Sequence, residues 1–133
     1  MKIVIDTNVF VSGVFWRGPP YRILQAWENG RFRLVVSQTI LTEYQRVLLD
    51  LSDHRPGIDF ERALELVDLH AEVVEPLLLT HSVCSDPDDD KFLAAALSAE
   101  AEYVVSGDKA LLATNGFRDL GVVTPKVFLE EFS

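Results

Sequence analysis

The sequence predicts an α/β fold built on a mainly parallel sheet. Short apolar runs rich in Val and Ile recur along the 133-residue chain, and polar residues, Gly or Pro bound each of them, as is typical of buried strands. Between these runs lie segments in which apolar residues recur every three or four positions, the spacing of a helix with one buried face. Strands that alternate with helices favour parallel crossover connections, so we expect a parallel sheet.

The expected strands are short and spread over the whole chain. The first is the run from Lys2 to Ile5, which ends at Asp6. The others are residues 32–37, 73–76, 103–106 and 122–124. Because ligands bind at the carboxyl ends of strands in open α/β sheets, polar residues that directly follow these strands are the first candidates for a site.

The expected helices follow from apolar spacing and from residues that favour helix ends. They cover residues 21–29, 39–51, 59–70, 86–100 and 125–132, with one helical turn at 109–113. Asp59 and Asp86 suit N-cap positions, and Pro87 suits a first helical position. Residues 9–15 are apolar but include Ser12 and Gly13, residues 16–20 and 52–57 are expected to be loops, and residues 77–83 fit no single element.

Length and composition predict a single domain over residues 1–133 that functions in the cytoplasm. The sequence lacks the roughly 20 consecutive apolar residues of a membrane helix and the features of a signal peptide. Its one cysteine, Cys84, excludes an internal disulfide and fits a core position better than a nucleophile. The net charge of −9 disfavours nucleic-acid binding through bulk positive charge, but it leaves room for a metal enzyme with clustered acids.

Four acidic residues occupy comparable positions along the chain. Asp6 and Asp108 lie just beyond the carboxyl ends of strands, and Glu43 and Asp90 lie near the starts of helices. In a parallel βαβ arrangement, strand ends and helix starts share one edge of the sheet. Helical spacing places Glu43 and Asp90 on the core side of their helices, whereas it rotates Asp89 away from that face.

Each acid also has a purely structural explanation. Asp6 and Asp90 could satisfy N–H groups at a helix start, Glu43 could pair with Arg46, and Asp108 could be a turn residue. Together they are harder to explain, because two carboxylates about 4 Å apart repel by about 4 kcal/mol at an effective dielectric constant near 20. Four converging acids must take up protons or cations, and an oxygen-only ligand set suits Mg²⁺ or Mn²⁺. Such ions promote phosphodiester hydrolysis.

Three segments carry a resemblance to a known family. MKIVIDTNVFVSG at residues 1–13, DPDDDKFLAAA at 86–96 and YVVSGDK at 103–109 resemble the acidic motifs of PIN-domain ribonucleases, and Glu43 matches the remaining motif. The resemblance covers essentially the whole chain and is greatest to the VapC-like toxins of toxin–antitoxin pairs.

The resemblance implies a fold, an activity and partners. The fold is a three-layer α/β/α sandwich with a parallel central sheet. The activity is endonucleolytic cleavage of RNA that depends on Mg²⁺ or Mn²⁺ and leaves a 5′-phosphate and a 3′-hydroxyl. The implied partners are RNA, a second copy of the chain in a homodimer, and a cognate antitoxin. By position, the metal and catalytic roles fall to Asp6, Glu43, Asp90 and Asp108, with Asn8, Ser106 and Ser12 in support.

Two other functions are alternatives. One is a phosphatase or phospho-acceptor domain with Asp6 as the nucleophile, although such enzymes usually carry a second Asp where this chain has Asn8. The other is a catalytically silent binding module that keeps the fold. Arg17, Lys91 and Lys109 are candidates for phosphate contact, but solvated surface charge is the simpler interpretation of all three.

Overall fold

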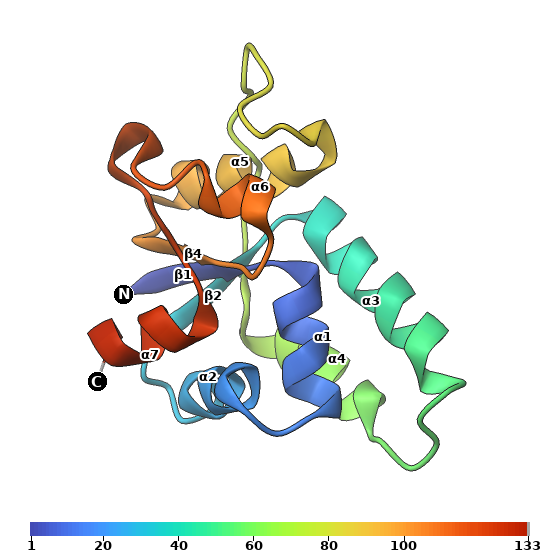
Figure 1. Ribbon diagram of the computed structural model, residues 1–133. Helices are drawn as coiled ribbons and strands as arrows, with labels where there is room; N and C mark the ends of the chain where they lie inside the picture. Colours follow the sequence, from blue (N-terminus) through green and yellow to red (C-terminus); the bar gives the residue numbers. More distant parts are fainter. Residues whose placement is uncertain (133) are drawn as a thin grey trace.

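A five-stranded parallel sheet forms the centre of the computed structural model, which describes residues 1–132 (Figure 1). Its spatial order is β3-β2-β1-β4-β5, and all four pairings are parallel. The strands are β1 (Lys2–Ile5), β2 (Arg33–Val36), β3 (Glu72–Val73), β4 (Tyr103–Val105) and β5 (Gly121–Val123). The expected parallel sheet is therefore confirmed.

β1 occupies the middle of this sheet. Its residues Ile3, Val4 and Ile5 are fully buried, as expected for a strand covered on both faces. The chain runs from β1 outward to β2 and β3 on one side, and later places β4 and β5 on the other. The strand order thus reverses between β1 and β4, and a reversal of this kind opens a crevice at the carboxyl ends of the two strands.

Helices cover both faces of the sheet, so the fold has three layers. Helix α5 packs against β1, β2 and β4, and Figure 1 shows α1, α2 and α7 on the opposite side. This arrangement confirms the α/β sandwich. The α-helices are α1 (Thr7–Phe15), α2 (Pro19–Glu28), α3 (Gln38–Ser52), α4 (Phe60–His70), α5 (Asp90–Ala99), α6 (Lys109–Leu112) and α7 (Pro125–Phe132), and the 3₁₀ turns are η1 (Pro87–Asp89) and η2 (Phe117–Asp119). No helix within residues 1–132 has both the length and the apolar character needed to cross a membrane.

Helix α1 is the main element that sequence patterns did not predict. Its residues are mostly β-branched or aromatic and include Gly13, so intrinsic propensity is low. It is buried almost all round, so no polar face marks a helical period. The helix forms because Asp6 caps it and because it packs against α2 and α3.

The remaining elements lie within a few residues of their predicted positions, with two informative exceptions. Pro19 and Pro20, expected in a loop, form the first turn of α2, where a missing N–H costs nothing. The acidic run at 86–90, expected as the start of one helix, instead forms the 3₁₀ turn η1 before α5 begins at Asp90. Asp86 caps this turn as expected, accepting from the Asp88 N–H at 3.0 Å.

Candidate metal centre

Asp6 lies at the base of the crevice between β1 and β4. Its side chain is only 4% exposed. Oδ1 accepts a hydrogen bond from the Val9 N–H at 2.8 Å, which makes Asp6 the N-cap of α1. Burial raises the pKa of the Asp6 carboxyl, the Ser106 and Val9 hydrogen bonds lower it, and the Asp108 charge raises it further. The capping role does not exclude metal binding, because each carboxylate oxygen keeps a further lone pair.

Ser106 connects the acids at the ends of β1 and β4. Its fully buried hydroxyl donates to Asp6 Oδ2 and accepts from the Asp108 N–H at 2.9 Å. The Asp108 side chain in turn caps α6 by accepting from the Ala110 N–H at 3.1 Å. One hydroxyl therefore holds Asp6 and Asp108 on the same edge of the sheet.

Asp89 lies against Asp108. It is not one of the four acids that the sequence and the resemblance assign to the metal. Burial, contact with the Asp108 carboxyl and the Asp108 charge, together with Asp86, raise the pKa of Asp89 to about 7. Asp89 Oδ2 is buried, and no group among residues 1–132 donates a hydrogen bond to it. Two carboxylates held together in this way require a proton or a cation between them.

Asp90 is directed to the preceding loop. Its Oδ1 accepts from the Cys84 N–H at 2.8 Å, and both of its oxygens lie within 3.2 Å of the Val83 N. Burial alone would raise the pKa of Asp90, but these backbone donors lower it below its ordinary value. Asp90 is therefore an ionised carboxylate that backbone donors orient toward the 83–84 segment.

The expected orientation of Asp89 away from the site is wrong. The expectation extended the α-helical period back through residue 89, but Asp89 belongs to η1, whose tighter winding rotates it toward Asp108. Helical spacing gives no signal that separates the two acids, because Asp89 and Asp90 each precede buried apolar residues by three and four positions.

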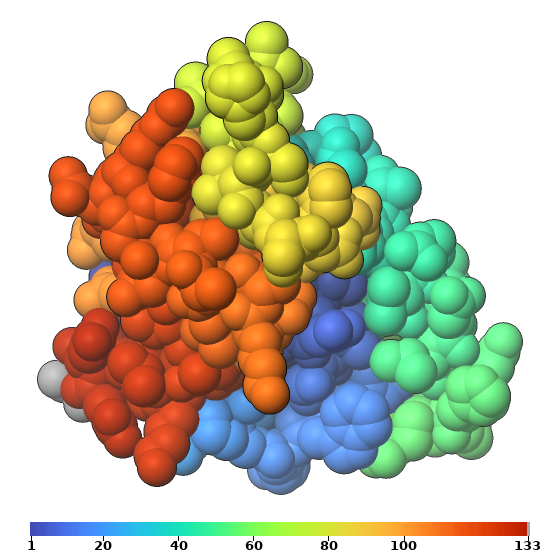
Figure 2. Space-filling model, turned by 45° about the horizontal axis from the view of Figure 1, so that its top comes forward, coloured from blue at the N-terminus to red at the C-terminus, as the bar shows by residue number. Residues whose placement is uncertain are grey.

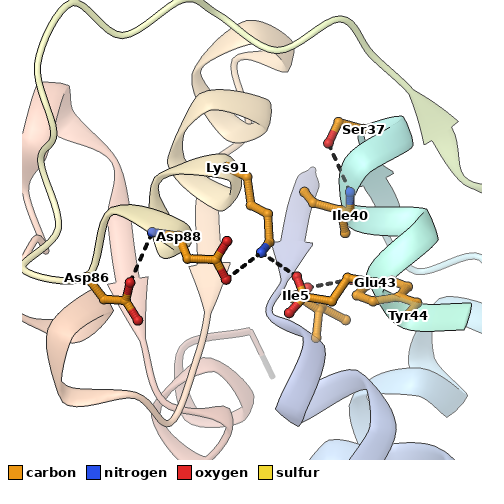
Figure 3. A network of polar contacts seen from close by, with 8 residues as sticks. All are labelled: Ile5, Ser37, Ile40, Glu43, Tyr44, Asp86, Asp88 and Lys91. Carbon is orange, nitrogen blue, oxygen red and sulfur yellow. Dashed lines mark hydrogen bonds and ion pairs between the residues drawn. The ribbon is translucent and has the colours of Figure 1, made fainter. Parts of the chain in front are cut away.

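Glu43 forms the opposite side of the centre and pairs with Lys91 rather than with Arg46. Lys91 Nζ contacts Glu43 Oε2 and lies 3.2 Å from Asp88 Oδ2 (Figure 3). The Lys91 side chain is 14% exposed, so its interpretation as solvated surface charge is wrong. Burial alone would lower the pKa of Lys91, but Glu43 and Asp88 raise it above its ordinary value.

Tyr44 supports the centre from below. Its buried hydroxyl donates to the Ile5 carbonyl, and its ring stacks on Phe10 with centroids 4.1 Å apart. Burial, with the nearby charges of Asp6 and Glu43, raises the pKa of Tyr44 well above its ordinary value. The residue thus ties α3 to the end of β1, the strand that leads into Asp6.

Two of the three expected supporting residues, Asn8 and Ser12, line an open groove beside Asp108, whereas Ser106 is fully buried. Asn8, Ser12 and Asp108 line it together with Val9, Pro20 and Gly107, and its volume is about 350 Å³. Figure 2 shows the blue N-terminal segment at the bottom of a hollow between α6 in orange, the yellow segment before α5, and α3 in teal. The groove therefore leaves Asp108 open to solvent.

The centre fits a divalent cation by the chemistry of its donors. Among residues 1–132, no three Asp, Glu, His or Cys side chains already converge as a preformed cage. The buried Asp6, the adjacent Asp89 and Asp108, and the unpartnered Asp89 Oδ2 nevertheless form an oxygen-only set with uncompensated negative charge. Hard cations such as Mg²⁺ and Mn²⁺ prefer such a set. Cys84 adds no soft ligand, because burial and the nearby carboxylates Asp90, Asp89 and Asp108 raise its pKa to about 12.

Two comparisons relate this chain to known proteins. The chain is 31% identical to the uncharacterized protein MJ1680 of Methanocaldococcus jannaschii over 144 aligned residues, which cover 99% of this chain and 92% of that protein. Residues 2–110 match the family model of the PIN domain, a range that contains every acid described above. PIN domains are in general metal-dependent nucleases. With the parallel sheet and the acidic edge already established, this match shows that the chain belongs to the PIN domain family.

Proposed function

We propose that this protein is a divalent-metal-dependent endoribonuclease of the cytoplasm. One observation carries the proposal: Asp89 and Asp108 lie side by side with an unpartnered buried oxygen, next to the buried Asp6, at the edge where β1 and β4 end. Helix capping explains the positions of Asp6 and Asp108 when each is considered alone. It does not explain why Asp89 and Asp108, two carboxylates that repel each other, lie side by side. A cation relieves this repulsion and brings a phosphate group to the same place.

Asp6, Asp89 and Asp108 are the proposed ligands, and Mg²⁺ or Mn²⁺ the proposed ion. When bound, such an ion stabilises negative charge on a phosphate and makes water a better nucleophile at neutral pH. Ser106 keeps Asp6 and Asp108 in position through its two hydrogen bonds. Asp90, a ligand by sequence position, instead anchors the 83–84 loop segment against the start of α5.

The groove beside the acids is the proposed path of the RNA backbone. Asn8 offers an exposed amide that can donate to phosphate oxygens, and Ser12 lies one helical turn further along α1. Neither residue needs a particular base, so the groove orients the backbone rather than reading sequence. Cleavage would leave a 5′-phosphate and a 3′-hydroxyl.

The decisive experiment is RNA cleavage with mapped ends by the wild type and by Asp6→Asn. The asparagine retains an acceptor for the Val9 N–H, so the cap and the fold should survive while the charge is lost. We expect cleavage in Mg²⁺ or Mn²⁺ to fall to background in Asp6→Asn and to stop in EDTA. Asp68→Asn, an exposed acid on α4, is the matched control and should cleave like the wild type. Equal cleavage by wild type and Asp6→Asn would overturn the proposal.

The same preparation tests the phospho-acceptor alternative. Both Asp6 oxygens already accept hydrogen bonds and the residue is 4% exposed, which is unfavourable for an attacking nucleophile. We therefore expect no aspartyl-phosphate at Asp6 after incubation with phosphate donors and trapping. Mass spectrometry that found phosphate on Asp6 would favour the alternative.

A toxin role, with a homodimer and a cognate antitoxin, is a further part of the proposal and follows from the family resemblance. Light scattering tests the dimer. The neighbouring gene tests the toxin role, because a small reading frame for a DNA-binding antitoxin is expected beside this one.

A further inference from the structure

Lys91 places a positive charge inside the acidic centre, and this has a consequence for how many metal ions the centre holds. Lys91 follows Asp89 by two residues, so one short segment supplies both the acid that faces Asp108 and the base that faces Glu43. Figure 3 shows its ammonium between Glu43 of α3 and Asp88 of η1. The lysine therefore links α3 to η1.

The contact with Glu43 is sheltered from solvent. Glu43 Oε2, the oxygen that Lys91 contacts, is a buried atom, and the two side chains are 20% and 14% exposed. Charges in such surroundings are weakly screened by water and salt. A divalent cation on the same oxygen would lie next to the ammonium and be repelled by it, so the pair and a Glu43-bound metal exclude each other.

Lys91 also changes the charge that the centre can offer. Lys91 offsets one negative charge among the acids that it contacts, Glu43 and Asp88. Asp89, whose Oδ2 is buried and unpartnered, lies against Asp108, and the Lys91 charge also acts on it.

From these contacts we propose that Lys91 is a built-in counter-ion that takes the place of a second metal at Glu43 and limits the centre to one divalent cation among Asp6, Asp89 and Asp108. This inference rests on the proposed function. Glu43 is then a positioning residue that acts through Lys91, and the lysine links α3 to η1.

The test measures Mn²⁺ stoichiometry and affinity by calorimetry on the full chain, with melting curves to confirm folding. We expect one Mn²⁺ per wild-type chain, affinity within about twofold of wild type in Glu43→Gln, and a loss of roughly tenfold or more in Asp108→Asn. Lys91→Met should expose Glu43 and add a second ion, and the double variant Lys91→Met/Glu43→Gln should return to one.

Two variants test whether a second ion binds because the Lys91–Glu43 ion pair is lost or simply because a positive charge near the centre is lost. Lys91→Arg keeps the ion pair and should bind one ion, and Lys109→Met removes an exposed lysine from the same edge of the sheet and should also bind one. Two ions in the wild type, or a tenfold loss in Glu43→Gln, would overturn the inference while leaving the nuclease proposal intact. One ion in a folded Lys91→Met would also overturn it. No Mn²⁺ binding by the wild type, together with no RNA cleavage, would overturn both.

Discussion

Asp89 and Asp90 are adjacent carboxylates with opposite surroundings. Asp90 is surrounded by backbone donors that lower its pKa, and Asp89 lies against another carboxylate that raises its pKa to about 7. Sequence patterns place Asp90 rather than Asp89 on the core side, because they treat the run as continuous α-helix. One 3₁₀ turn changes the direction of a side chain without changing composition, so periodicity alone could not distinguish the two residues.

The pair of variants Asp89→Asn and Asp90→Asn tests this distinction directly. Asp89→Asn should weaken Mn²⁺ binding by roughly tenfold or more, since it removes a ligand. It should also slightly stabilise the metal-free protein, since it removes the repulsion with Asp108. Asp90→Asn should cost about 1–3 kcal/mol of unfolding free energy, because charge-assisted bonds to the Val83 and Cys84 N–H groups are weakened.

Calorimetry with Mn²⁺ and urea denaturation measure the two effects separately. The interpretation is wrong if Asp90→Asn loses metal binding at full stability while Asp89→Asn keeps it.

At the level of elements, the strands and amphipathic helices were predictable and α1 was not. Strands β1 and β4 are short runs of Val and Ile, and α3 has one buried face, so local pattern identifies them. Helix α1 depends on its neighbours: it packs tightly on α2 at Gly13, where an added Cβ would lie 2.6 Å from Leu24 Cδ1 and 2.9 Å from the Pro20 carbonyl. A contact of this kind depends on tertiary packing and produces no helical periodicity of apolar residues in the sequence.

Gly13→Ala tests the importance of this close approach. We expect a loss of about 1–3 kcal/mol in unfolding free energy, because the methyl group must push α1 and α2 apart or displace Leu24. Gly107→Ala is the matched control, since a Cβ there meets no atom within 4 Å. Urea denaturation of the two variants should give clearly different midpoints, and equal midpoints would show that the α1–α2 contact adjusts without cost.

At the scale of the whole molecule, the net negative charge and the proposed cation binding both affect the stability of the folded state. The chain carries a net charge of −9, and its centre concentrates part of that charge at one edge of the sheet. Sequence composition alone made RNA binding difficult to rationalise. Under the proposed function, the acids that repel RNA in the absence of metal are the groups that would hold a cation for its phosphate.

The stability of the metal-free protein should therefore fall as pH rises. The pKa of Asp89 is about 7 in the folded protein against an ordinary value of 3.8, so between these pH values the folded state keeps a proton that the unfolded state has lost. Raising the pH through this window favours the unfolded chain. Melting temperatures in EDTA should decline from about pH 5 to pH 7.5, and much less in Asp89→Asn.

Added Mn²⁺ should reverse the decline at the upper end of this range. A ligand at about 100 times its dissociation constant stabilises the folded state by about 2.7 kcal/mol. A melting temperature in EDTA that rises between pH 5 and pH 7.5 would contradict the assigned pKa of Asp89.

The hydroxyl of Ser106 donates to Asp6, a residue 100 positions away in the sequence. The acids it aligns cannot meet until β4 has paired with β1, a step that closes almost the entire polypeptide into a loop and is correspondingly slow to occur. Under the proposed function, ion binding should be a late event in folding, and a refolding chain should acquire it together with its final tertiary structure. A nascent chain released before β4 is complete has Asp6 but neither Ser106 nor Asp108, so truncated products of translation should not bind Mn²⁺.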